Sequence, residues 1–146
     1  MSACTFFGHH DCPAEIKPKL RKAIIDLIEQ QGVDCFYIGN HGAFDRMACS
    51  CLRELSQEYP QICYSVVLAY LPQKHDEFDK RDFSDTILPE GIETVPRRFA
   101  ISWRNRWMLE RSDFVVTYIT HSWGGAAQFA ELAVRQQKTV INVLTK

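Results

Sequence analysis

Residues 114–127 read FVVTYITHSWGGAA, and this stretch decides the fold. Its first six residues are apolar, β-branched or aromatic, as in a buried strand, and Gly124 and Gly125 then stand where a helix begins. Two glycines at such a junction let a ligand approach backbone N–H groups. Those N–H groups and the helix dipole favour an anion such as phosphate, so the stretch predicts an anion-binding turn. The alternative is a turn needed only for packing.

Outward from this unit, strand and helix patterns alternate along the chain. Apolar runs predict strands at 3–7, 35–38, 63–71, 114–119 and 139–143, and helical spacing predicts helices at 13–31, 43–59, 96–112 and 124–137. Such alternation predicts an α/β fold with a mainly parallel sheet of about five strands. At 146 residues the chain is expected to form a single domain, residues 1–146.

Two segments carry further expectations. Residues 72–95 are charged and turn-rich, which predicts a long loop. Phe99, Trp103 and Trp107 recur every four residues, which predicts an aromatic stripe that faces the core of the third helix.

Composition limits the classes of partner. The chain is 46% hydrophobic and 24% charged with a net charge of -1, so no overall basic field draws it to nucleic acid or to a membrane. No signal-peptide pattern and no apolar run of about 20 residues is visible, which indicates a cytoplasmic protein with reduced thiols. The six cysteines form no CxxC pair. We therefore expect structural thiols and no metal site.

Ligands of parallel α/β sheets bind at the carboxyl ends of the strands, where three predicted loops meet. The segments 8–12, 39–45 and 121–127 are therefore expected to form one ligand-binding mouth. The candidate residues in these loops are Gly8, His9, His10, Asp11, Gly39, Gly42, Asp45, Ser122, Gly124, Gly125 and Ala126.

Each loop also has a plainer interpretation. Asp11 is also typical of a simple helix cap, and His9 and His10 are alternatively metal ligands that need Cys12, His41 or His121 to complete a site. The 39–45 segment is equally typical of a routine strand-to-helix turn, with Asp45 stabilising the helix N-terminus. Neither GxGxxG nor GxxxxGK[ST] occurs, which excludes the usual dinucleotide fingerprint and the P-loop. We expect no cofactor.

Charged residues on the third and fourth helices complete the candidate set. Arg104 and Asn105 supply a planar cation and an amide, both suited to phosphate or ribose. The alternative is a solvated helix face on which Arg106 pairs with Glu110. Glu131, two turns into the last helix, is either a general acid/base or an ordinary surface carboxylate.

Four motifs in order resemble the SLOG superfamily, and in particular its YpsA-like branch. Thr5–Asp11 resembles the TFTGHR-type opening, with His10 where Arg is commoner, and Gly42–Ala48 resembles the GxDxxA-like motif. Arg104–Met108 resembles RN-x-x-M, and Gly124–Ala127 resembles the second glycine motif. The resemblance implies a Rossmann-like three-layer sandwich that binds a nucleotide or nucleotide-derived ligand. It also implies a bacterial-type protein that forms a homo-oligomer.

The resemblance also extends to the LOG phosphoribohydrolases, which cleave the N-glycosidic bond of nucleoside monophosphates. Arg104, Gly124, Gly125 and Glu131 fall on functional positions of that family, whereas Trp123, Ala127 and Gln128 depart from its pattern. The alternative function is therefore an N-glycosidic-bond hydrolase in which Glu131 or Asp45 is catalytic. A lower alternative, from the resemblance to DNA-processing protein A, is single-stranded nucleic-acid binding through the arginines Arg97, Arg98, Arg104 and Arg106.

Overall fold

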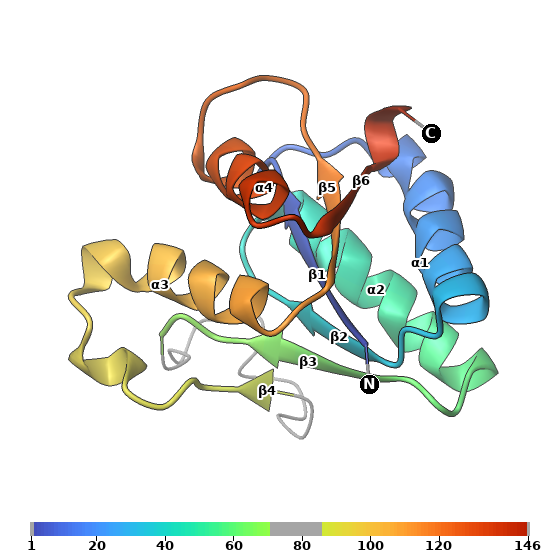
Figure 1. The fold of residues 1–146 in the computed structure, drawn as a ribbon, viewed down its shortest axis with the longest axis horizontal. Helices are drawn as coiled ribbons and strands as arrows, with labels where there is room; N and C mark the ends of the chain where they lie inside the picture. Colours follow the sequence, from blue (N-terminus) through green and yellow to red (C-terminus); the bar gives the residue numbers. More distant parts are fainter. Residues whose placement is uncertain (1, 71–85, 146) are drawn as a thin grey trace.

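The computed structural model describes residues 2–70 and 86–145 as three layers, with a parallel sheet between two pairs of helices (Figure 1). The helices α1 (Lys17–Gln31) and α2 (Gly42–Glu58) pack on one face of the sheet, and α3 (Arg97–Glu110) and α4 (Gly125–Arg135) pack on the other. This arrangement confirms the predicted α/β fold with a parallel sheet.

In the described residues the sheet has six strands in the order β4-β3-β2-β1-β5-β6, every neighbouring pair parallel. The strands are β1 (Ala3–Gly8), β2 (Cys35–Ile38), β3 (Cys63–Val67), β4 (Thr86–Ile87), β5 (Phe114–Tyr118) and β6 (Thr139–Asn142). The layered arrangement arises because β1, β2, β4 and β5 are each followed by a helix that crosses over the sheet before the next parallel strand begins. The prediction of about five strands missed β4, whose two residues are too few to show a periodic pattern. β4 lies within the segment 72–95 that was predicted to be a loop, of which residues 72–85 lie outside the described residues.

The helices begin and end close to the predicted positions. They are α1 (Lys17–Gln31), α2 (Gly42–Glu58), α3 (Arg97–Glu110) and α4 (Gly125–Arg135). Gly32 ends α1 with a φ of 69°, a left-handed conformation in which glycine has no steric penalty. No helix in the described ranges has both the length and the apolar character that a bilayer crossing requires.

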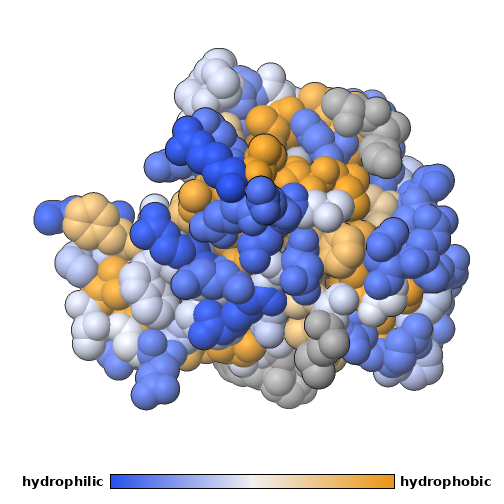
Figure 2. Space-filling view, in the orientation of Figure 1, coloured by the Kyte–Doolittle hydropathy of each residue, from blue (hydrophilic) through white to orange (hydrophobic). Residues whose placement is uncertain are grey.

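The central strand β1 is buried on both faces. Phe6 packs with α1 and α2, whereas Phe7 packs with α3 and α4. Burial on both sides explains why the strand is apolar throughout and does not alternate. On the outer surface, hydrophilic side chains cover much of the face in Figure 2, and apolar side chains gather near β6.

The aromatic stripe predicted for the core face of α3 is confirmed only in part, because Trp103 and Trp107 are half-buried against core residues whereas Phe99 is exposed. Phe99 is 51% exposed, and the residues of α3 that face the sheet are Ala100, Arg104 and Met108. This second stripe is offset by one residue from the aromatic one and has the same period, so spacing alone does not distinguish them. Trp107 is half-buried, with its ring edge-on to Tyr37 at 5.5 Å. Because the face of α3 that contains Arg104 packs against the sheet, the Arg104 side chain lies in the interior.

Candidate functional site

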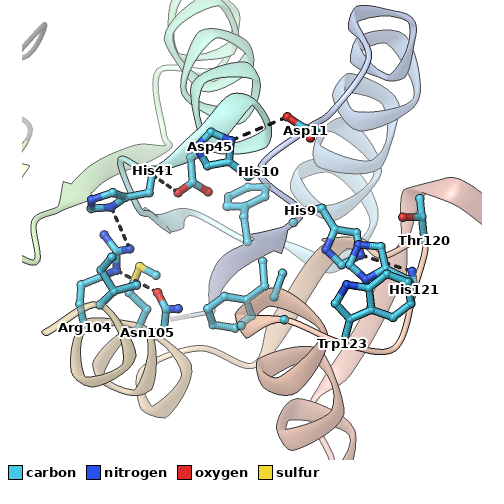
Figure 3. Close-up of a pocket in the computed structure, with 18 residues that line it drawn as sticks. His9, His10, Asp11, His41, Asp45, Arg104, Asn105, Thr120, His121 and Trp123 are labelled. Atoms are coloured by element: carbon cyan, nitrogen blue, oxygen red, sulfur yellow. Dashed lines mark hydrogen bonds and ion pairs between the residues drawn. The ribbon is translucent and has the colours of Figure 1, made fainter. Parts of the chain in front are cut away.

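A cavity of about 660 Å³ opens at the carboxyl ends of β1 and β5, where the loops that follow β1 and β5 meet α2 and α3. The chain order of the strands reverses here: β1 is flanked by β2 on one side and by β5 on the other. Open α/β sheets bind ligands at this kind of switch point, because the loops on its two sides diverge and leave a crevice. Figure 3 shows a polar wall with Arg104, Asn105 and His41, and opposite it the rings of His9, His121 and Trp123.

Arg104 is the centre of the polar wall and is only 2% exposed. Its Nη1 donates to the Val67 carbonyl oxygen at 2.8 Å and to Asn40 Oδ1 at 3.2 Å. Its Nε donates to Asn105 Oδ1 at 2.9 Å, and its Nη2 lies 3.4 Å from His41 Nδ1. Because three oxygen acceptors hold the guanidinium, Arg104 is a fixed positive charge in the wall of the cavity.

Asp45 lies in the first turn of α2, beside this charge, and is 8% exposed. Its Oδ2 accepts a hydrogen bond of 3.0 Å from the backbone N–H of His41. Burial raises the pKa of Asp45 to about 6, although the charge of Arg104 and the His41 N–H both act to lower it. The carboxyl group therefore changes charge close to neutral pH.

Gly39 makes room for both charged groups. A Cβ atom at this position would lie 2.8 Å from Asp45 Oδ2 and 2.9 Å from Arg104 Cζ. Real Cβ atoms do not approach other atoms so closely, so a side chain here would displace the charged pair. The requirement for glycine comes from this close approach, since Gly39 is not among the glycines with positive φ.

The opposite wall is a stack of three rings. The His9 and His121 centroids are 3.7 Å apart with an interplanar angle of 14°, and those of His121 and Trp123 are 3.8 Å apart at 20°. His9 Nε2 accepts a 3.4 Å hydrogen bond from the backbone N–H of His121. Burial and the neighbouring His121 lower the pKa of His9, which favours the neutral ring.

The N-terminus of α4 forms the end of the cavity between these walls. Gly124 precedes the helix with a φ of 94°, and its carbonyl accepts the first helical bond, from Gln128 N at 3.0 Å. Within residues 2–70 and 86–145, no side chain caps the N–H groups of Gly125, Ala126 and Ala127. These donors and the helix dipole leave a positive helix end at the cavity.

The N-terminus of α2 has two of its N–H groups satisfied within the fold. The carbonyl oxygen of His10 accepts from Ala43 N at 2.8 Å, and Asp45 accepts from the N–H of His41, the residue before the helix. In the described residues α2 therefore has part of its N-terminal donors satisfied, whereas the N–H groups of Gly125, Ala126 and Ala127 in α4 have no partner.

The structure brings most predicted site residues to the cavity. Those that line it are Gly8, His9, His10, Asp11, Asp45, Arg104, Asn105, Gly124, Gly125 and Ala126. Gly39 lies behind the wall against Arg104 and Asp45, and Gly42 packs against the backbone of His10. Ser122 is exposed and does not line the cavity.

Glu131 is not brought to this site. Its side chain is 64% exposed and forms an ion pair of 2.6 Å with Arg135, one turn further along α4. No cluster of three or more potential metal ligands is found within the described ranges.

Sequence analysis did not assign a binding role to His41, Thr120, His121 or Trp123, all of which line the cavity. The two histidines were considered only as metal ligands, and Trp123 only as a departure from the LOG pattern. Their position directly after a strand was the available signal, because every loop at the carboxyl edge of a parallel sheet contributes to the same mouth.

Comparison with known proteins supports the fold. A UPF0398 protein from Halalkalibacterium halodurans is 26% identical over 145 residues, which is 91% of this chain and 75% of that protein. No protein-family model matches the chain.

Solved structures are more distant in sequence. DNA processing protein A (DprA) from Streptococcus pneumoniae superposes with a TM-score of 0.71 at 15% identity, over 96% of this chain and 49% of that one. The fold is Rossmann-like. DprA from Helicobacter pylori, studied for its single-stranded DNA binding mode, gives a TM-score of 0.65 at 15% identity over 95% of this chain and 63% of that one. The chain thus spans about half to two thirds of the DprA proteins it matches.

A third structure with this fold is the molybdenum cofactor carrier protein of Chlamydomonas reinhardtii, with a TM-score of 0.60 at 15% identity over 96% of this chain and 75% of that one. Together these likenesses support the Rossmann-like fold that the resemblance of the sequence motifs implied. The ligands of the relatives differ, so the fold by itself does not name the ligand of this chain.

Proposed function

We propose that this protein binds a nucleotide or nucleotide-derived ligand in the cavity at the carboxyl ends of β1 and β5. The observation that carries the proposal is the uncapped N-terminus of α4, which opens into the cavity that Arg104 lines. Phosphate is placed on the N–H groups of Gly125 and Ala126, since a helix end with free donors is a natural anion site. Arg104 provides a fixed counter-charge.

The remaining lining residues would contact the ribose or base. Asn105 and Asp45 provide an amide and a carboxyl group, and the Gly8–Asp11 loop forms the adjoining edge of the cavity. In this proposal the four sequence motifs place the chain in the YpsA-like branch of the superfamily.

A thermal-shift screen tests the proposal. The screen uses nucleoside mono-, di- and triphosphates, ADP-ribose, cyclic nucleotides and NAD. A ligand at ~100 times its Kd stabilises the folded state by about 2.7 kcal/mol, which raises Tm by about 5–10 °C in a chain of this size.

Two matched variants at Gly125 locate the phosphate. An added Cβ there meets nothing within 4 Å, so both Gly125→Asp and Gly125→Asn fit the fold. The carboxylate stabilises the helix end by about 0.3–1 kcal/mol but repels phosphate. We expect Gly125→Asp to keep its Tm and to bind the nucleotide about ten-fold or more weakly than Gly125→Asn. Equal nucleotide affinities would contradict a phosphate at this helix end.

Asp45 favours a second candidate function, hydrolysis of an N-glycosidic bond. Asp45 is a buried carboxyl group on the cavity wall, whereas the other catalytic candidate, Glu131, is exposed and paired with Arg135. An ionised carboxylate would activate water or stabilise positive charge that develops on the ribose.

If the protein is this hydrolase, nucleoside monophosphates release free base, which chromatography detects. Because the pKa of Asp45 is raised to about 6, the rate should increase as pH rises through about 6 and Asp45 loses its proton. Asp45→Asn should lower the rate by about 100-fold or more. Base release with a flat pH profile in that range, or unchanged by the substitution, would exclude Asp45 as the catalytic carboxylate.

The nucleic-acid alternative loses one of its proposed contacts, since Arg104 is buried, while Arg97, Arg98 and Arg106 are exposed on α3. Oligonucleotide binding with a steep salt dependence that free mononucleotides do not reproduce would favour this alternative.

A further inference from the structure

Trp123 is unusual among the large side chains of this protein because it is 70% exposed while it lines the cavity. Tryptophan side chains are on average largely buried, since the ring has a large apolar surface. The exposure of Trp123 places that apolar surface beside the N-terminus of α4, with Gly124 as its immediate neighbour in the chain.

The orientation of Trp123 is held from below by the rest of the stack. His9, at the bottom, is 8% exposed, and its backbone N–H donates to the Tyr118 carbonyl at 3.1 Å. The ring of Tyr118 meets His9 edge-on, with centroids 6.3 Å apart at 78°. Because the lower ring is buried and the rings above it are nearly parallel to it, the stack orients the indole plane toward the cavity.

The stack also has a cost to stability. His121 Nδ1 is buried and has no hydrogen-bond partner among the described residues. A buried polar atom without a hydrogen-bond partner lowers stability. The stacked arrangement of His9, His121 and Trp123 is therefore not explained by its contribution to stability alone. One face of Trp123 is covered by His121, and no further ring contact to the other face is found in the part of the chain that the structure describes.

Trp123 and the N-terminus of α4 line the same cavity, and apart from chain neighbours no side chain packs over the two glycines at the helix end. A Cβ atom added at Gly124 or at Gly125 would meet nothing within 4 Å. A ligand that lies on the indole therefore has an open path to the N–H groups of α4. A nucleotide matches these two surfaces, because its flat base can lie on the indole while its phosphate reaches the N–H groups of α4. A sugar phosphate without a base would leave the indole uncovered.

We propose that Trp123 is the stacking platform for the base of the ligand, so that the protein selects nucleotides over sugar phosphates. This inference rests on the proposed function, because it takes the phosphate site at α4 as given. The base becomes the fourth ring of the stack, in contact with the exposed face of Trp123. Stacking accepts any base, and we expect a modest preference among bases and a strong preference for a base over none.

The test is calorimetric titration of the wild type with AMP, GMP, CMP, UMP and ribose 5-phosphate, repeated on the variants Trp123→Ala and Trp123→Phe. In Trp123→Ala we expect the affinity for the bound nucleotides to fall by about 5- to 150-fold, the range of one base–aromatic stack. Ribose 5-phosphate affinity should stay within about two-fold. Trp123→Phe should retain most nucleotide affinity, because it keeps an aromatic face.

Fluorescence provides a second measurement. Nucleotide should quench the indole emission of the wild type and of a control variant, Trp107→Phe, whose ring packs on Tyr37 outside the cavity. Trp123→Phe should bind without that quenching. Nucleotide affinity unchanged in Trp123→Ala, or ribose 5-phosphate bound as tightly as the nucleotides by the wild type, would overturn the inference alone. If the wild type binds none of the five compounds and no compound of the thermal-shift screen stabilises it, the proposed function is overturned and this inference with it.

Discussion

Replacement of Arg104 by Ala should lower the free energy of unfolding by about 3–5 kcal/mol. The guanidinium is 2% exposed, and its removal leaves the Val67 carbonyl and the Asn40 side-chain oxygen without their donor. It also removes the positive charge that acts to lower the pKa of the buried Asp45. Chemical denaturation at pH 7 measures the change.

Arg106→Ala is the matched control, since Arg106 is an exposed arginine on the same helix. Its expected effect is within about 0.5 kcal/mol, as for most surface substitutions. A loss below about 1 kcal/mol in Arg104→Ala would mean that the hydrogen bonds of Arg104 contribute little to stability. Arg104→Lys keeps the charge and loses the planar set of donors, and we expect an intermediate stability.

Gly8→Ala should also destabilise the protein strongly, by about 3 kcal/mol or more. Gly8 ends β1, and a Cβ atom there would lie 2.2 Å from two ring carbons of Phe44, which is itself buried. Neither partner has room to move, because Gly8 is paired with Tyr118 of β5 and Phe44 is buried in the hydrophobic core. Overpacking of this kind forces side chains from their rotamers or shifts the backbone. The same backbone shift would displace His9, the innermost ring of the stack of His9, His121 and Trp123.

Gly125→Ala is the control for this substitution, since the added methyl group meets nothing within 4 Å and Gly125 has no positive φ. It should be neutral or slightly stabilising. The double variant Gly8→Ala/Phe44→Ala should be more stable than the sum of the two single effects predicts, because the second change removes the clash. Strict additivity of the two effects would show that the ring of Phe44 is not the cause.

Much of the fold could be predicted from local pattern. Apolar runs such as 114–119 and the helical spacing within residues 13–31 each depend on neighbours a few positions apart, so their periods are visible in the chain. A parallel sheet then requires that the loops after β1, β2 and β5 lie at one edge, which is why residues as distant as His9, Asp45 and Gly124 could be assigned to one mouth.

Only the tertiary structure determined which side chains of these segments are buried and which contact one another. The stripes that contain Trp103 and Arg104 have the same period, and packing against the sheet selected the one that buries an arginine. The stack of His9 on His121 joins residues 112 positions apart, and neither position has a local signal for the other. Local sequence determines which segments form strands and helices because their hydrogen bonds and hydrophobic faces repeat along the chain. Burial of Arg104, the raised pKa of Asp45 and the orientation of Trp123 depend on side chains that meet only after those segments pack.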